Sequence, residues 1–228
     1  MWALIRPNGL SDLCVKIETG VSRPLNFRRE GILRHMLHLK SKYWLEGYAL
    51  AMYSSSYDFI EGQSFTELGE AVHKFKYWKL PPQDRDRIQD FCVRSMQRAL
   101  VDKFGPNLPF NFIVAVPANR KEGHSIPPLM SKDLAGRSAG QLTDATKSLV
   151  KLKELPSMKN LSTEEKAVVL SDAYLFKDNL PKPLRGILII DDIFHTGTTL
   201  RFVARSISLT YPEVPKYVMT LTALKSNY

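Results

Sequence analysis

Gly186-Ile-Leu-Ile-Ile-Asp-Asp-Ile-Phe-His-Thr-Gly-Thr-Thr-Leu200 is the stretch of the chain from which the fold can be read. The aliphatic run at 186–190 predicts a buried strand of a parallel sheet that stops at Asp191 and Asp192. A hydroxyl-rich loop follows, and the apolar spacing from Leu200 onward predicts a helix. Ligands of open parallel sheets bind at the carboxyl ends of the strands, so this strand, loop and helix predict a ligand site.

The loop after the strand carries the groups that hold a phosphate. At Thr196, Gly197, Thr198 and Thr199, backbone N–H groups, threonine hydroxyls and the helix dipole can converge on one anion. Two carboxylates beside such a loop suit a phosphorylated sugar, because its vicinal hydroxyls can donate to them. The segment therefore predicts a ribose-phosphate site, and the sequence contains neither G-x-x-x-x-G-K-[ST] nor G-x-G-x-x-G. A strand that is merely capped by Asp and Thr is the alternative.

The rest of the chain alternates between strand and helix patterns. Strands are predicted at 48–53, 112–116, 148–155, 174–176 and 216–224, and helices at 65–78, 84–104 and 129–140. The polar segment 156–169 predicts a long mobile loop. This alternation predicts an α/β fold with a mostly parallel sheet and helices on both faces.

The composition is that of an ordinary globular protein with a basic surface. The 228 residues carry a formal net charge of +9, which favours anionic partners such as phosphorylated small molecules, nucleic acids or acidic lipids. No apolar run approaches the roughly 20 residues that span a bilayer, so we expect a cytoplasmic protein with no membrane partner. Cys14 and Cys92 stand in no metal or redox spacing and predict no disulfide.

The pattern at 186–200 resembles the phosphoribosyl-pyrophosphate (PRPP) motif of type I phosphoribosyltransferases. Further segments resemble ComF-like members of that family in their order along the chain: Lys76-Tyr77, Ala115-Val-Pro117, 122–135 and 161–174. The resemblance covers 48–228 and implies one phosphoribosyltransferase-like domain there, with 1–47 as an N-terminal extension or hood. The chain departs from the family at Glu122, where Arg is expected, and two cysteines cannot build the four-cysteine zinc element of many relatives.

The resemblance also implies roles for individual residues. Asp191 and Asp192 would hold the ribose hydroxyls, directly or through water bound to Mg²⁺. The groups that would bind the 5-phosphate are Thr196, Gly197, Thr198 and Thr199. The groups that would meet the pyrophosphate are Arg120, Lys121 and Gly123. His195 would either accept a proton from the incoming base or help to bind phosphate.

The polar loop resembles the flap that closes over PRPP in type I enzymes. Its cations would be Lys159 and Lys166, which would neutralise the departing pyrophosphate. A plain surface loop with solvated charges is the alternative for this segment, as it is for the loop that contains Arg120.

These roles imply an enzyme that binds PRPP with Mg²⁺ and transfers phosphoribose to a nucleobase-like acceptor or related amine, with release of pyrophosphate. The alternative is an accessory protein that binds PRPP without transfer, because ComF-like proteins are associated with DNA uptake. Lys74 and Lys76 alternate with Phe75, Tyr77 and Trp78, so these lysines could reach the pyrophosphate or bind single-stranded DNA. A helix end with packed aromatic rings and solvated lysines is the alternative. A DNA-handling protein is another candidate partner. A Rossmann-like domain without PRPP is a third hypothesis, and a homodimer is compatible with all three.

Overall fold

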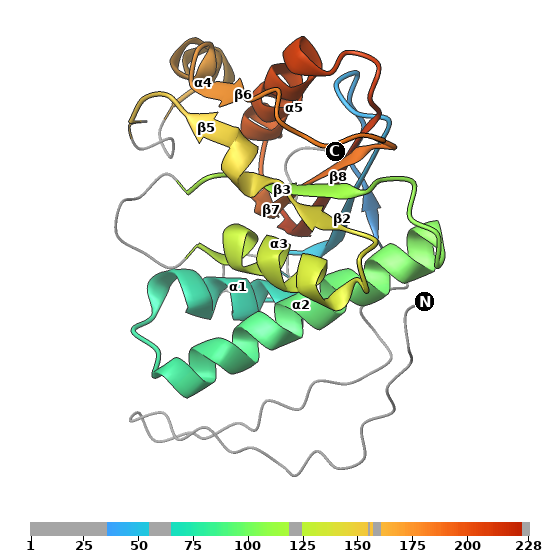
Figure 1. Ribbon diagram of the computed structural model, residues 1–228. Coiled ribbons are helices and arrows are strands. Elements are labelled where there is room, and N and C mark those ends of the chain that lie inside the picture. The colour runs from blue at the N-terminus through green and yellow to red at the C-terminus, as the bar shows by residue number, and fades with distance from the viewer. Residues whose placement is uncertain (1–35, 55–64, 119–124, 155, 157–160, 225–228) are drawn as a thin grey trace, which may run out of the picture.

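A computed structural model describes residues 36–54, 65–118, 125–154, 156 and 161–224 (Figure 1). Its main sheet has six strands in the order β1 (Leu37–His38), β2 (Glu46–Met52), β8 (Lys216–Ala223), β7 (Ile187–Phe194), β3 (Phe112–Ala115) and β4 (Thr143–Asp144). Every neighbouring pair is parallel except β1 with β2. A separate antiparallel pair is formed by β5 (Leu149–Lys151) and β6 (Tyr174–Phe176).

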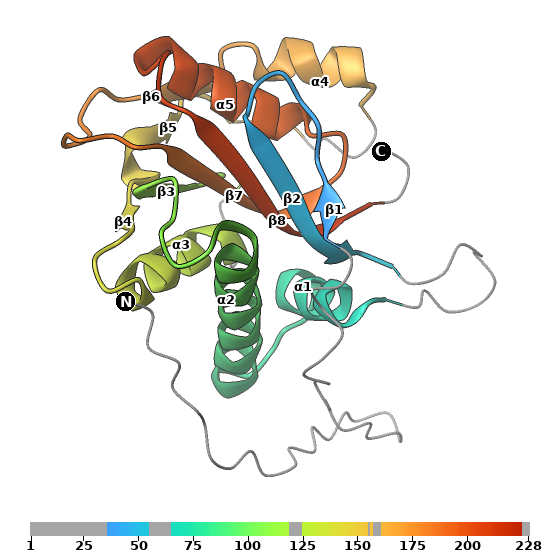
Figure 2. The same ribbon diagram turned by 90° about the vertical axis from the view of Figure 1, so that its right-hand side faces the viewer.

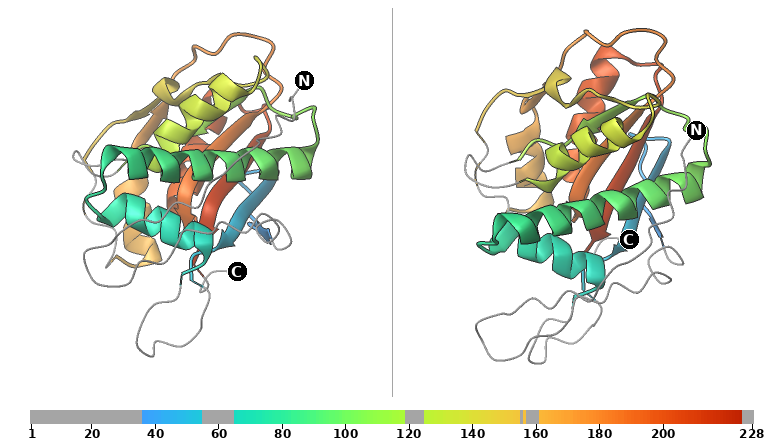
Figure 3. Two further views of the ribbon diagram at one scale, coloured as in Figure 1. Left: turned by 90° about the horizontal axis from the view of Figure 1, so that it is seen from below. Right: turned by 60° about the horizontal axis from the view of Figure 1, so that its bottom comes forward.

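Helices cover both faces of this sheet (Figure 2). One face packs against α1 (Glu67–Tyr77), α2 (Pro82–Phe104) and α3 (Ile126–Arg137), and α2 crosses the strands in Figure 3. The other face packs against α5 (Thr198–Thr210), beside which lies α4 (Thr163–Leu170); a short 3₁₀ turn occupies Thr146–Ser148. The expected α/β class with a mostly parallel sheet and helices on both faces is confirmed.

The aliphatic run of β7 is buried because each of its faces meets a helix layer. Leu188 and Ile190 pack in the core formed with α1, α2 and α3, whereas Ile187 and Ile189 pack in the core formed with α5. Successive strand residues point to opposite faces, so a strand with helices on both sides needs an unbroken apolar run.

β7 does not stop at the aspartates as predicted, and continues through them to Phe194. The extension pairs with β8, where Asp191 lies opposite Thr220 and Ile193 opposite Thr222. On the other side β3 ends at Ala115, which pairs with Ile190. Both aspartates therefore lie beyond the end of β3 and remain held in the sheet by β8.

The prediction of a loop at 156–169 is wrong for its second half, which forms α4. Ser162 and Glu165 make a complete capping box, because each side chain accepts a hydrogen bond from the other residue's backbone N–H. The S-x-x-E signature of this box was present in the sequence and identifies a helix start. Lys166 accordingly lies on a helix, and Lys159 lies outside the described residues.

Two further element boundaries differ from the sequence-based prediction. α3 begins at Ile126, three residues early, because Pro127 and Pro128 fit the first turn of a helix, where their missing N–H groups are not needed. The strand expected at 148–155 is only Leu149–Lys151 and pairs outside the main sheet. None of the described helices is long and apolar enough to cross a membrane.

Candidate functional site

The acidic pair at the end of β7 faces two different layers of the protein. Asp192 contacts Lys76 of α1, on the face covered by α1, α2 and α3. Asp191 lies on the opposite face, where it influences the hydroxyl of Tyr174 on β6. The backbone here is held on both sides: Asp192 N–H donates to Asp191 Oδ1 at 2.9 Å, and Thr222 Oγ1 donates to the carbonyl of Asp192 at 3.2 Å.

The two carboxyl groups lie in different electrostatic surroundings. Burial, followed by repulsion from the Asp192 carboxylate, raises the pKa of Asp191 to about 8, although Lys76 and the Asp192 N–H act in the opposite direction. Asp191 is therefore mainly protonated at pH 7 and can donate a hydrogen bond as well as accept one. Asp192, in contrast, is paired with a lysine.

Lys76 is the partner of Asp192. Its Nζ lies 3.0 Å from Asp192 Oδ1 and 2.9 Å from Oδ2. Burial opposes the charge of this lysine, but the charge and hydrogen bond of Asp192 outweigh it and raise the pKa of Lys76. The neighbouring Lys74 contacts different groups. Its Nζ lies 2.7 Å from Glu70 Oε1 and 5.3 Å from the centroid of the Trp78 ring.

The loop after β7 enters α5 through a left-handed glycine. Gly197 has φ = 69° and caps the helix, and a Cβ at this position would lie 2.7 Å from the ring of Phe194. The hydroxyls of Thr196 and Thr198 are 2.8 Å apart, and Thr199 stands next in the first turn of α5. The first N–H groups of a helix have no intrahelical acceptor, so the loop presents backbone donors and hydroxyls together.

His195 and Lys166 lie near each other at the entrance to this loop. His195 is exposed, and burial of part of its ring, followed by the positive charge of Lys166, lowers its pKa. The imidazole is thus mainly neutral at pH 7 and able to accept a proton. Lys166 reaches the site from α4, where its side chain is buried.

Tyr174 is a site residue to which the sequence analysis gave no role. Its hydroxyl is buried and has no hydrogen-bond partner among the described residues. Burial raises the pKa of Tyr174, and the nearby Asp191 raises it further. An unpaired buried hydroxyl costs free energy unless something binds it, so this group is available to a ligand or water beside Asp191. A tyrosine within a predicted strand next to the polar segment was the only signal in the sequence.

An aromatic cluster lies beside Lys76 on α1. The Tyr53 hydroxyl and His73 Nδ1 are 2.9 Å apart, and the His73 ring stacks on Phe65 with centroids 4.6 Å apart. The ring of Tyr77 lies 5.0 Å from that of His73. Burial raises the pKa of Tyr53 to about 12, with Tyr77 adding to the shift, so its hydroxyl stays protonated.

The structure brings together seven of the predicted site residues on one continuous segment: Asp191, Asp192, His195, Thr196, Gly197, Thr198 and Thr199. Lys166 joins them from α4. The predicted pyrophosphate groups Arg120, Lys121 and Gly123 lie outside the described residues. Lys76, which the sequence analysis considered only as a contact for an anion, is an integral part of the acidic pair.

The acidic pair is a poor direct ligand set for a metal ion. Asp191 is mainly protonated, and both oxygens of Asp192 already accept from Lys76. The described residues contain no cluster of three or more His, Cys, Asp or Glu side chains that could hold a metal ion. The remaining lone pairs can accept hydrogen bonds from cation-bound water, which suits a cation that arrives on a ligand.

The structure is similar to a solved structure of Helicobacter pylori xanthine-guanine-hypoxanthine phosphoribosyltransferase. The sequence identity is 13%, the TM-score is 0.40, and the match covers 62% of this chain and 77% of that chain. No family model and no curated protein matches the sequence.

Proposed function

We propose that this protein is a phosphoribosyltransferase that binds PRPP together with Mg²⁺ and transfers phosphoribose to a nucleobase or related amine. The observation that carries the proposal is the acidic pair at the end of β7 directly beside the threonine loop at the N-terminus of α5. A sugar phosphate suits these two neighbouring features, because its ring hydroxyls can donate to carboxylates while its phosphate accepts from N–H groups and hydroxyls.

In this proposal the loop fixes one end of the ligand and the carboxyl groups fix the ring. Backbone N–H groups of α5 and the hydroxyls of Thr196 and Thr198 bind the 5-phosphate. Asp191 and Asp192 hold the ribose hydroxyls, and the neutral Asp191 can donate to an oxygen as well as accept from a hydroxyl. A sugar held in this way would present its anomeric carbon to an acceptor beyond the carboxyl ends of the strands.

The transfer step exchanges one bond at the anomeric carbon. The acceptor nitrogen forms the C–N bond as the C–O bond to pyrophosphate breaks, and His195 accepts the proton that the nitrogen loses. Asp191 and Asp192 would contact a substrate-bound Mg²⁺ through its water ligands, and such an ion would supply positive charge that stabilises the leaving group. Lys166 adds a fixed positive charge from α4, and we keep Arg120, Lys121, Gly123 and Lys159 as proposed further contacts of the pyrophosphate.

Titration calorimetry with PRPP and saturating Mg²⁺ tests the binding part of the proposal. We expect the wild type to bind and the Asp191→Asn/Asp192→Asn variant to lose at least about tenfold in affinity, which corresponds to loss of one or two charge-assisted hydrogen bonds. Asp172→Asn is the matched control, since Asp172 is an exposed carboxylate outside the site. Absence of PRPP binding by the folded wild type would refute the proposal.

Release of pyrophosphate in the presence of a panel of nucleobases and amines tests the transfer part. An acceptor-dependent signal that the double variant lacks supports an enzyme. The segment 1–47 is the proposed hood, but residues 37–47 include β1, the start of β2 and the core residues Leu39 and Trp44. The test therefore removes only residues 1–35, which is expected to change the choice of acceptor more than the affinity for PRPP.

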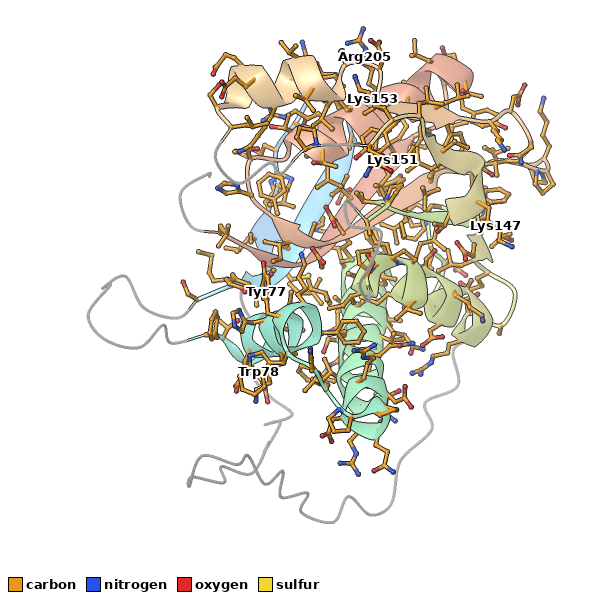
Figure 4. All side chains as sticks on the ribbon, turned by 90° about the vertical axis from the view of Figure 1, so that its left-hand side faces the viewer. Tyr77, Trp78, Lys147, Lys151, Lys153 and Arg205 are labelled. Carbon is orange, nitrogen blue, oxygen red and sulfur yellow. The ribbon has the colours of Figure 1, made fainter. Side chains whose placement is uncertain are left out.

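A second candidate is an accessory protein of the ComF type that binds PRPP without transfer and handles single-stranded DNA. Its support is a pair of exposed aromatic rings, Tyr77 at 48% and Trp78 at 42%, at the end of α1. In the same view, Lys147, Lys151, Lys153 and Arg205 lie on the side of β5 and α5 (Figure 4). Exposed rings and cations together suit a single strand, whose bases stack while its phosphates pair. This candidate predicts PRPP binding without turnover and DNA binding that weakens with salt.

A further inference from the structure

The contact between Lys76 and Asp192 joins two parts of the molecule that are far apart in the chain. Lys76 belongs to the last turn of α1, 116 positions before Asp192. α1 is not part of the strand, loop and helix that form the sugar-phosphate site. The acidic pair therefore receives its positive charge from a different element.

The ammonium group of Lys76 is partly exposed and can bind a second anion beside Asp192. The side chain of Asp192 is 10% exposed and that of Lys76 is 31% exposed, so the ammonium group covers the carboxylate on one side and meets solvent on the other. An ammonium group has three N–H donors, of which the two oxygens of Asp192 use at most two. At least one donor can reach a ligand phosphate while the contact with Asp192 is kept.

α1 is held firmly enough to keep the lysine in this place. Thr66 caps the helix by accepting from Gly69 N–H at 3.0 Å and also donates to the carbonyl of Met52 at the end of β2. Gly69 approaches the carbonyl of Tyr53 so closely that a Cβ would lie 1.8 Å from the oxygen. Phe75, next to Lys76, is buried in the core.

We propose that Lys76 is a built-in cation of the site, which bridges Asp192 and a phosphate of the ligand in the way that a divalent cation would. It fills the position from which a metal could reach Asp192 and takes over part of the neutralisation of the pyrophosphate. Binding of PRPP then depends less on Mg²⁺ than it would with the aspartates alone. The identity of the ligand rests on the proposed function, whereas the role of the lysine rests on the contact itself.

The main test measures PRPP affinity by calorimetry with saturating Mg²⁺ and with a chelator, for wild type and Lys76→Met. For each protein, the affinity for PRPP with Mg²⁺ is divided by the affinity without Mg²⁺. This ratio is expected to be about tenfold larger in Lys76→Met than in wild type, as for two directly coupled groups. Lys76→Arg keeps the charge and should behave like wild type. Lys74→Met is the matched control, because it removes a lysine from the same helix turn that pairs with Glu70. An equal effect of Mg²⁺ on the affinity for PRPP in wild type and Lys76→Met would overturn the proposal.

A second measurement needs no PRPP. Binding of Mn²⁺ to the ligand-free protein, followed by electron paramagnetic resonance, should be about tenfold tighter in Lys76→Met, because Asp192 becomes free to bind a cation. Lys74→Met should have the same affinity for Mn²⁺ as the wild type. If no variant binds PRPP, the proposed function fails and this measurement alone decides on Lys76. Unchanged Mn²⁺ affinity in folded Lys76→Met would then refute the built-in cation.

Discussion

Asp191 and Asp192 show how neighbouring residues acquire different chemistry from their surroundings. Asp192 points toward α1 and pairs with Lys76. Asp191 is buried on the opposite side, near the hydroxyl of Tyr174, which has no hydrogen-bond partner in the part of the chain that the structure describes. Asp192 is therefore paired with a cation, while burial raises the pKa of Asp191. The pair can offer a ligand both an anion and a neutral donor.

Asp191→Asn tests the raised pKa of Asp191. A carboxyl group that is protonated in the folded protein and ionised in the unfolded chain stabilises the fold less as the pH rises from about 4 to about 8. The free energy of unfolding of the wild type should therefore fall relative to Asp191→Asn across this window, by at most about 1.4 kcal/mol per pH unit, and the difference should stay constant above it. Urea unfolding at a series of pH values measures this. A difference that does not change with pH would contradict the prediction.

Gly197→Ala tests the conformation of the phosphate loop. The left-handed φ costs a residue with a Cβ about 1–2 kcal/mol, and the new methyl group would also press on the ring of Phe194. We expect a loss of stability of at least this size and weaker PRPP binding. Gly140→Ala is the control, since Gly140 also has positive φ but no atom within 4 Å of its Cβ position. Equal losses of PRPP affinity in both variants would show that the loop geometry is not needed for binding.

At the scale of elements, the site depends on two helices that approach β7 from opposite faces. α1 brings Lys76 to Asp192, and α4 brings Lys166 close to His195. The capping box of Ser162 and Glu165 fixes where α4 starts, while the close approach of Gly69 to β2 fixes the position of α1. A change in the docking of either helix should therefore alter the charges around the ligand without touching the motif.

Gly69→Ala tests the docking of α1. Alanine normally stabilises a helix interior by about 0.5–1 kcal/mol relative to glycine. Here the methyl group would collide with the Tyr53 carbonyl, so we expect a loss of more than about 1 kcal/mol and a greater effect of Mg²⁺ on PRPP affinity as Lys76 moves away. Gly136→Ala in α3 is the control, because a Cβ there meets nothing within 4 Å, and it should stabilise the protein. Thermal unfolding of both variants decides this, and a stabilised Gly69→Ala would disprove the close contact.

At the scale of the whole molecule, the order of the strands places the site at the centre of the sheet. β7 lies between β8 and β3, with helices on both faces, so the carboxyl end of β7 is surrounded by several loops and helix ends. The formal net charge of +9 adds a long-range attraction for anions. Phosphorylated ligands and nucleic acid would both be drawn to this surface.

Salt dependence distinguishes these two anions. If Lys147, Lys153 and Arg205 contact the phosphates of single-stranded DNA, the logarithm of the affinity should fall with the logarithm of salt concentration with a slope of about −2. Changing Lys153 and Arg205 to Gln should make the slope shallower by about 1.4 and leave PRPP affinity little changed. Fluorescence anisotropy with a labelled oligonucleotide measures the slope. No DNA binding at low salt would exclude the second candidate function.

Local patterns of the sequence were sufficient to predict the strand, loop and helix that carry the acidic pair. The aliphatic run of β7, the left-handed glycine and the amphipathic α5 are neighbours in the chain, so their order predicts the strand, loop and helix and the position of the acidic pair. The S-x-x-E start of α4 was equally local and was overlooked because the segment around it is polar.

The groups that surround the acidic pair come from elements that are distant in the chain and meet only in the folded protein. Lys76 meets Asp192 across 116 positions, and the protonation of Asp191 depends on how deeply β7 is covered. Burial, charge pairing and the shift of a pKa arise from elements that pack against one another, and no local pattern states which helix will lie over a given strand. For this reason the sequence could identify the two aspartates, while the raised pKa of Asp191 and the lysine partner of Asp192 followed from the fold.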